Sequence, residues 1–253
     1  MTKPMTAALI LAGNRKGGDK LAEAEGVSHK TLIEVGGKPM IERVVEALRA
    51  SGRIDRILIS VNKPKLINIP GAATIKSAKS LAESLIEGVN ALGAPAFITT
   101  GDHALLEPEW VRYFLDNAPE TDFTLALARS EVVQAATPDT QRTYYKLADG
   151  SFSGCNMFYM RTQRAVGGIE LWREFETLRK QPLKMLQKLG PAAIFAYATG
   201  RLTTKRISKE VERMTGGLTS AVIEMPFGRS AIDVDKPSDL ELVRRLVEQD
   251  AAA

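Results

Sequence analysis

Ala7-Ala-Leu-Ile-Leu-Ala-Gly13, an apolar run closed by glycine, decides the fold of this 253-residue chain. An uninterrupted apolar stretch of this length is typical of a strand buried on both faces of a parallel sheet. It is followed by Gly13-Asn-Arg-Lys-Gly-Gly-Asp-Lys20, which is rich in glycine and cations. Residues 39–48 then repeat apolar side chains at helical spacing. Strand, long loop and helix form the opening unit of an α/β fold.

The same alternation continues along the chain. We expect strands at 56–61, 72–75, 96–100 and 122–128, separated by helices at 81–92 and 108–115. Beyond these the pattern predicts a hairpin over 143–160, helices over 170–214 broken at Pro182 and Gly190-Pro191, strands at 220–225 and 231–234, and a last helix over 237–248. The sequence therefore predicts a single α/β domain over 1–253, with a helical insertion at about 165–215 that serves as a lid or a dimerisation surface.

Composition narrows the class of protein. With 44% hydrophobic and 25% charged residues the chain can bury one sizeable core. Its first apolar run is too short to span a bilayer and the residues before it lack signal-peptide order, so we expect a cytoplasmic protein. The single cysteine, Cys155, and only two histidines make a zinc site implausible, so any metal should be a hard ion held by oxygen. A net charge of +4 without a nucleic-acid-binding motif favours small phosphorylated ligands over nucleic acid.

The glycine-rich loop is the first candidate site. Ligands of doubly wound sheets bind beyond the carboxyl ends of the strands, where this loop must lie. Its backbone N–H groups could approach phosphate oxygens, and Arg15, Lys16 or Lys20 could neutralise their charge. The loop matches neither a P-loop nor the dinucleotide fingerprint, and an ordinary solvated loop stays open as an alternative.

A second candidate is Lys30, which precedes a short strand-like run and the turn Gly36-Gly-Lys-Pro-Met40. With Leu9-Ile-Leu-Ala-Gly13, these residues resemble the signature of the MobA-like nucleotidyltransferases, which include the molybdenum-cofactor guanylyl- and cytidylyltransferases, methylerythritol-phosphate cytidylyltransferase and the sugar nucleotidyltransferases. The resemblance implies a Rossmann-like nucleotidyltransferase (GT-A-like) fold, a mostly parallel mixed sheet flanked by helices with one reversed strand.

The resemblance also implies a nucleotide site. Residues 13–18 would cradle the triphosphate, while Lys30 and Arg15 would stabilise charge on the α-phosphate as catalytic residues. This loop departs from the family's usual Gly-x-Gly-x-Arg order and carries an extra segment, 21–28. The implied nucleotide-binding set is Leu11, Ala12, Gly13, Asn14, Arg15, Gly17, Gly18, Lys30, Ser77, Ser80, Leu81, Gly101 and Asp102.

A metal site follows from two acidic motifs. Asp102, in Thr99-Thr-Gly-Asp-His103, stands at the end of a predicted buried strand, where a carboxylate can hold Mg²⁺ against phosphate oxygens. Asp235, in Asp233-Val-Asp-Lys-Pro-Ser-Asp239, matches the family's second metal ligand. Two-residue alternation puts Asp233 on the same face as a further candidate. Mn²⁺ could substitute for Mg²⁺. Asp239 is explained by its place in the first turn of a helix.

The acceptor would face the predicted hairpin. Arg142 and Lys146 could clamp an anion and Asn156 could bond a hydroxyl, with His103 as a further contact or as a support for Asp102. Plain surface residues stay open as the alternative.

We therefore expect an enzyme that transfers a nucleoside monophosphate from an NTP, with CTP favoured by the Ser77-Ala-Lys-Ser80 turn, onto a small anionic acceptor of the phosphoglycerate or polyol-phosphate type. The alternatives are a molybdenum-cofactor-type transferase, a GT-A glycosyltransferase and a non-catalytic nucleotide-binding protein. A homodimer is compatible with each.

Overall fold

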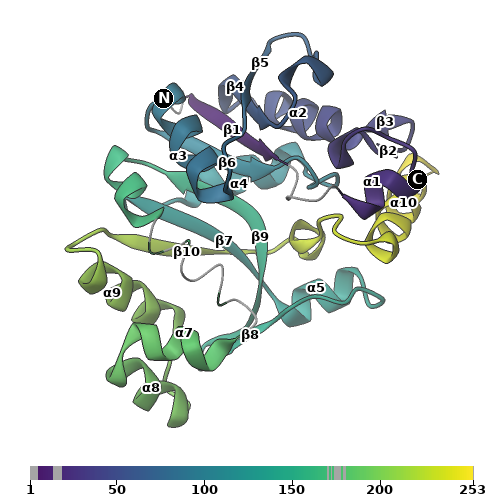
Figure 1. The fold of residues 1–253 in the computed structure, drawn as a ribbon. Coiled ribbons are helices and arrows are strands. Elements are labelled where there is room, and N and C mark those ends of the chain that lie inside the picture. The colour runs from purple at the N-terminus through teal and green to yellow at the C-terminus, as the bar shows by residue number, and fades with distance from the viewer. Residues whose placement is uncertain are drawn as a thin grey trace.

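A computed structural model describes residues 5–13, 19–169, 171, 173, 178 and 181–252 of the chain. Its centre is one sheet in the order β10-β7-β9-β6-β1-β4-β5, with β8 paired to β9 (Figure 1). The strands are β1 (Thr6–Ala12), β4 (Ile54–Val61), β5 (Ala72–Lys76), β6 (Ala96–Thr100), β7 (Phe123–Arg129), β8 (Tyr145–Leu147), β9 (Gly150–Met160) and β10 (Ser220–Met225). A separate two-stranded ribbon joins β2 (Glu34–Val35) to β3 (Lys38–Pro39).

The sheet is parallel except around β9, which runs antiparallel to β6, β7 and β8. The predicted single reversed strand within a mostly parallel sheet is therefore confirmed. It brings the β8–β9 hairpin to the carboxyl ends of the parallel strands, because an antiparallel strand starts where its neighbours stop.

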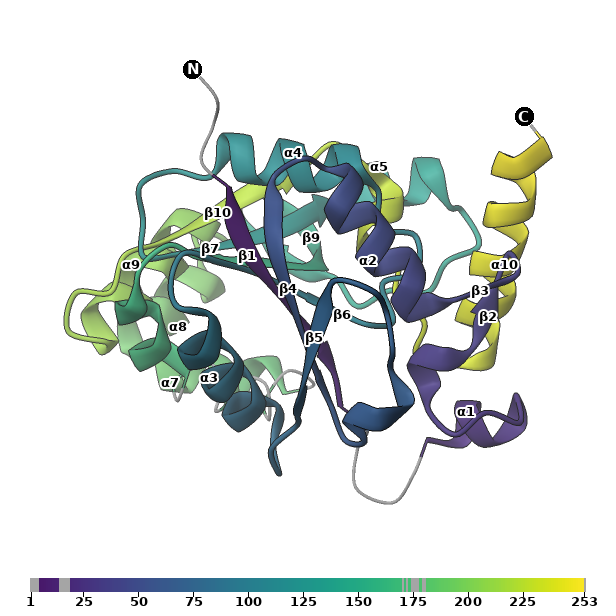
Figure 2. The ribbon, with the colours of Figure 1, turned by 90° about the horizontal axis from the view of Figure 1, so that it is seen from above.

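Helices cover both faces of the sheet, and Figure 2 shows α2 and α4 on one side with α3 on the other. The helices are α1 (Lys20–Ala24), α2 (Met40–Ala50), α3 (Leu81–Leu92), α4 (Pro108–Asn117), α5 (Ser130–Ala136), α7 (Pro182–Leu189), α8 (Pro191–Ala198), α9 (Thr204–Met214) and α10 (Pro237–Ala252). None of the described helices is long and apolar enough to cross a bilayer.

Strand β1 shows why its sequence reads as continuously apolar. Successive side chains alternate between two cores: Leu9 joins the one that contains Leu85 on α3, and Ile10 joins the one that contains Ile41 on α2. The approach of α3 is close, since a Cβ built on its Gly88 would lie 2.5 Å from Leu9 Cδ1. A larger residue at position 88 would require the Leu9 side chain to shift.

Most predicted elements are confirmed within a residue or two, but the strand predicted at 231–234 is wrong. Residues 228–231 form a 3₁₀ turn, η4, and the chain then runs without strand pairing to α10. The Val234 N–H donates to the Asp102 carbonyl at 3.1 Å instead of to a strand neighbour. This contact fixes the C-terminal segment to the loop that follows β6.

The helical insertion divides where predicted, with α7 ending before Gly190 and α8 starting at Pro191. Together α7, α8 and α9 form a cluster at the lower left of Figure 1, away from α10 and the β2–β3 ribbon. The cluster is tied to the hairpin because Thr204 donates its N–H and its hydroxyl to Asp149 Oδ2, at 2.9 and 2.6 Å.

Candidate functional site

Three carboxylates from distant parts of the chain meet at the carboxyl end of β6. Asp102 follows β6, and Asp233 and Asp235 lie on the segment between η4 and α10. One oxygen from each lies within 4.8 Å of the others. The predicted convergence of these residues is therefore present, although the segment of Asp233 and Asp235 is an extended loop and not the strand that was expected.

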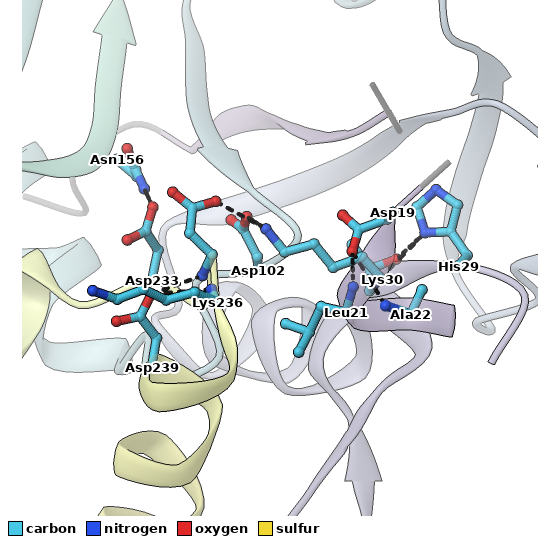
Figure 3. A network of polar contacts seen from close by, with 12 residues as sticks. Asp19, Leu21, Ala22, His29, Lys30, Asp102, Asn156, Asp233, Lys236 and Asp239 are labelled. Atoms are coloured by element: carbon cyan, nitrogen blue, oxygen red, sulfur yellow. Dashed lines mark hydrogen bonds and ion pairs between the residues drawn. The ribbon is translucent and has the colours of Figure 1, made fainter. Parts of the chain in front are cut away.

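Lys30 inserts its ammonium between two of these carboxylates (Figure 3). Its Nζ lies 2.6 Å from Asp102 Oδ2 and 3.1 Å from Asp235 Oδ1, and the side chain is only 12% exposed. Burial lowers the pKa of Lys30, but the charges and hydrogen bonds of Asp102 and Asp235 outweigh it and raise the pKa above its usual value. Lys30 is therefore a fixed positive charge at neutral pH.

The backbone around Lys30 is set by His29. Lys30 begins a 3₁₀ turn, η1 (Lys30–Leu32), and His29 Nδ1 accepts the Thr31 N–H at 3.3 Å as the N-cap of that turn. An accepting Nδ1 carries no proton, and burial lowers the pKa of His29. The capping role of His29 was not predicted from the sequence. Its position immediately before Lys30 was the available signal.

Asp102 is largely buried, with its side chain 18% exposed, and has a cationic partner. Burial raises the pKa of its carboxyl, and the ammonium of Lys30 opposes that shift. Its second oxygen, Oδ1, is buried and makes no hydrogen bond within the described residues. Hard oxygen donors, a cation already held between two of them and an unsatisfied buried oxygen together fit a divalent metal of the Mg²⁺ type.

Asp233 is held from the other side by two residues near the hairpin. Arg142 donates through Nη2 to Asp233 Oδ1 and through Nε to the Ala231 carbonyl, the latter at 2.7 Å. Asn156 donates through Nδ2 to Asp233 Oδ2 at 2.7 Å, and its backbone has a φ of 48°, in the left-handed region that asparagine tolerates. The structure thus turns the side chains expected to hold the acceptor toward Asp233.

Two other expected acceptor contacts lie elsewhere. His103 is completely buried against Trp110, with ring centroids 6.1 Å apart, and burial lowers its pKa to about 4. His103 was expected either to contact a ligand or to support Asp102, and its complete burial favours the supporting role. Lys146 is exposed on β8 and pairs with Ser151, five residues before Asn156. At about 3.3 Å per residue along a strand this is roughly 16 Å, so Lys146 is not brought to the carboxylates.

The nucleotide end of the site is built from the ends of β1, β4 and β5. A Cβ on Gly13 would lie 3.4 Å from Ser77 Oγ and 3.8 Å from Asn62 Oδ1, so both side chains flank the start of the glycine loop. Ser77 Oγ is buried and makes no hydrogen bond within the described part of the chain. Asn62 was missed by sequence reasoning. Asn14, Arg15, Gly17 and Gly18, all predicted to bind nucleotide, lie outside the described residues.

The remaining predicted nucleotide residues divide by role. Leu11 and Ala12 are buried in β1. Gly101 permits close packing, since a Cβ there would lie 2.7 Å from Thr31 Cγ2. Ser80 caps α3 by accepting the Glu83 N–H at 3.1 Å, whereas Leu81 is exposed.

Asp239 holds Asp235 in place from the first turn of α10. Its Oδ2 accepts the N–H groups of Asp235 and Lys236 at 3.1 and 3.2 Å. This matches the expected preference for a carboxylate at a helix start. It also fixes the loop that presents Asp235 to Lys30.

Known proteins of similar sequence are named cytidylyltransferases. The 3-deoxy-manno-octulosonate cytidylyltransferase of Vibrio cholerae serotype O1 is 25% identical over 242 residues, covering 88% of this chain and 92% of the relative. The corresponding enzyme of Maricaulis maris is 23% identical over 240 residues, covering 86% and 90%.

Solved structures agree on the fold. A hypothetical transferase from Thermus thermophilus superimposes with a TM-score of 0.80 at 29% identity, covering 93% of this chain and 99% of that one. CMP:2-keto-3-deoxy-manno-octonic acid synthetase, solved with CTP, superimposes at 0.57 with 17% identity, covering 97% and 99%. The family model of the MobA-like NTP transferase domain matches residues 8–207. The chain is therefore a nucleotidyltransferase and belongs to the MobA-like NTP transferase domain family.

Proposed function

We propose that this nucleotidyltransferase moves CMP from CTP onto a small anionic acceptor and releases pyrophosphate. The observation that carries the proposal is the ammonium of Lys30, which is held between Asp102 and Asp235. These residues lie at the carboxyl ends of the central strands, where the glycine loop also begins. A fixed cation beside oxygen ligands suits the one group that every NTP presents, its triphosphate.

The chemistry needs positioning and charge neutralisation, and no covalent enzyme intermediate. An acceptor oxygen forms a bond to the α-phosphorus while the bond to the bridging oxygen breaks, and pyrophosphate leaves with the electron pair. Lys30 stabilises the charge that develops on the α-phosphate, and loop N–H groups beyond Gly13 hold the other phosphates. A phosphate or carboxylate acceptor is already ionised at neutral pH, so no general base is required.

A divalent cation, with Mg²⁺ preferred and Mn²⁺ able to substitute, belongs to the same proposal. Asp102 and Asp235 would hold it, with Asp233 as a third candidate ligand. When bound, such an ion neutralises phosphate charge. In this chain Arg142 and Asn156 keep Asp233 oriented, and Asp239 keeps Asp235 oriented.

Cytosine as the base is supported by the named cytidylyltransferases among the relatives and by Ser77. The buried hydroxyl of Ser77 beside Gly13 has a free hydrogen-bonding capacity within the described residues. A guanylyltransferase of the molybdenum-cofactor type is the second candidate, because the family match by itself does not choose the base.

The acceptor class rests on charge. A phosphate monoester of a polyol or of glycerate fits the ionised-nucleophile scheme. The Vibrio cholerae and Maricaulis maris relatives are named for a sugar acid, which is also anionic. A sugar hydroxyl would have to lose a proton during attack, which gives the two acceptor classes different pH profiles.

The test is pyrophosphate release with each of the four NTPs and Mg²⁺, using a panel of polyol phosphates, phosphoglycerates, sugar acids and a pterin acceptor. Release that needs CTP and an anionic acceptor supports the proposal. Release with GTP and a pterin acceptor supports the second candidate. Failure of every combination, with Lys30→Ala as the matched blank, would contradict both.

A further inference from the structure

The helix α8 exposes its large apolar side chains and buries its small ones. Ile194, Phe195 and Tyr197 are 41, 65 and 43% exposed, whereas Ala193 and Ala196 are fully buried. At about 100° per residue, Ile194 and Phe195 lie on the face opposite the two alanines, and Tyr197 lies at its border. A helix that packs only to satisfy its own domain would show the reverse arrangement.

The alanine face of α8 packs into the small apolar core of the α7–α9 cluster. Ala193 and Ala196 pack there with Leu186 of α7 and with Leu202, which precedes α9. Within the described part of the chain, the outward apolar face of α8 therefore does not pack into a hydrophobic core. Ile194 and Phe195, with Tyr197 at the border, form an exposed apolar patch of the kind that marks a binding surface.

Basic residues predominate along the chain around α8, although Glu210 and Glu212 follow on α9. From Gln181 to Lys209 the chain contains no aspartate or glutamate, and its basic residues are Lys184, Lys188, Arg201, Lys205, Arg206 and Lys209. Arg206 reaches the first turn of α8, donating from Nη2 to the Ala192 carbonyl at 3.4 Å, and Arg201 follows the helix directly. Lys205 and Lys209 are exposed and lie four residues apart, on one face of α9.

We propose that the outward face of α8 and the basic residues around it dock this enzyme onto an anionic lipid bilayer. Aromatic and aliphatic side chains enter the interface between headgroups and acyl chains, while lysine and arginine bind the lipid phosphates beside them. The occupant is chosen by charge. A second copy of the chain would bring two like-charged surfaces together, and a nucleic acid would leave the aliphatic Ile194 without a partner.

The docking face is separate from the carboxylate site, so the enzyme can be bound and active at once. The cluster of α7, α8 and α9 lies at the lower left of Figure 1, away from α10, whereas Asp235, which pairs with Lys30, lies two residues before α10. Membrane docking would place the catalytic domain beside acceptors or products that carry a lipid. It does not depend on which base the enzyme selects.

The experiment is co-sedimentation of the full chain with vesicles of phosphatidylcholine mixed with phosphatidylglycerol, compared with phosphatidylcholine alone. We expect binding to the anionic vesicles only, weakened by salt. Phe195→Ser should reduce the partition coefficient roughly tenfold by removing the largest inserted side chain. Lys205→Glu with Lys209→Glu should reduce it by at least about fivefold for each lysine.

Matched controls come from the opposite edge of the sheet. Leu66, 39% exposed, and the exposed Lys63 and Lys65 lie around the turn η2 (Pro64–Leu66), which packs against β5. Leu66→Ser and Lys63→Glu with Lys65→Glu should leave vesicle binding unchanged. All variants should melt within a degree or two of the wild type, because each replaced side chain is exposed.

Three results would overturn the proposal. One is equal binding by wild type and the α8 and α9 variants. Another is concentration-dependent dimerisation that Phe195→Ser abolishes, which would assign the face to a second copy. The third is a preference for single-stranded RNA over anionic vesicles in direct competition.

Discussion

Lys30 and Asp102 form an ion pair of 2.6 Å between residues that are 72 positions apart in the sequence. The pair puts a side-chain ammonium where oxygen donors would otherwise face a metal ion, and Asp235 completes the arrangement at 3.1 Å. One ammonium thus offsets part of the negative charge of two carboxylates. The triphosphate would then have to draw Lys30 away from them.

Replacing Lys30 by Ala should lower kcat by about 10²- to 10³-fold while raising the KM for CTP only a few-fold. The reason is that its charge is needed most when the α-phosphorus becomes five-coordinate. Steady-state kinetics at saturating acceptor measure both constants. Lys38→Ala, which removes an exposed lysine paired with Glu46, serves as the control. A large rise in KM with kcat intact would make Lys30 a ground-state binder.

Replacing Lys30 by Met should tighten the binding of Mn²⁺ in the absence of nucleotide. In the wild type the ammonium competes with the metal for Asp102 and Asp235, and methionine has similar length without the charge. We expect an affinity at least about tenfold higher, measured by titration calorimetry. Equal affinities for the two proteins would show that lysine and metal do not share these oxygens.

Asp102→Asn and Asp235→Asn should each abolish most of the dependence of the rate on Mg²⁺. Because both carboxylates are proposed to neutralise one ion, the double variant should be little slower than either single variant. Rates measured over a series of Mg²⁺ concentrations provide the comparison. Additive losses in the logarithm of the rate would mean that the two aspartates serve separate sites.

Arg142→Ala should act through Asp233 and not through the acceptor. Removing the guanidinium leaves a part-buried carboxylate beside Asp102 and should destabilise the fold by about 2 kcal/mol in urea unfolding. The double variant Arg142→Ala/Asp233→Ala should lose less than the sum of the single losses. A sharp rise in the acceptor KM with unchanged stability would instead restore Arg142 as an anion clamp.

The stability of the protein should fall as the pH drops below about 6.5, the usual pKa of histidine. Burial lowers the pKa of His29, so the unfolded chain binds a proton that the folded chain does not. The stabilisation is present above the unfolded pKa and is lost toward the lower folded one. His29→Asn keeps the cap and removes the titration, so its melting temperature should fall less between about pH 7.5 and about pH 5.5. An identical slope for both proteins would contradict this.

The repeating elements could be predicted because their signals are local. Residues 81–92 and 96–100 have the period and the breakers of a helix and a buried strand, and both elements have those bounds in the structure. The strand prediction for residues 231–234 was wrong because a short apolar-polar alternation also fits an extended loop. The backbone of such a loop forms its hydrogen bonds outside the sheet. The Val234 N–H donates to the Asp102 carbonyl, and no local sequence pattern predicts that partner.

The candidate site was predictable where residue type and motif agree, as for Lys30, Asp102 and Asp235. It was not predictable for Arg142 and Asn156, because a cation and an amide near a hairpin suit an acceptor as well as a neighbouring aspartate. Only the fold shows that Asp233 lies between them. The choice between the two expected roles of His103 was not predictable either, since adjacency to Asp102 in the chain does not say on which side the ring is buried.

The bond between the Val234 N–H and the Asp102 carbonyl has a consequence for biosynthesis. The strand that presents Asp102 leaves the ribosome long before residues 233–239 do, and the central sheet still lacks β10 at that stage. A nascent chain therefore carries Lys30 and one carboxylate but not their partners. The cluster of Lys30, Asp102, Asp233 and Asp235 is therefore complete only after residues 233–239 have been synthesised and their loop has docked against the turn at Asp102.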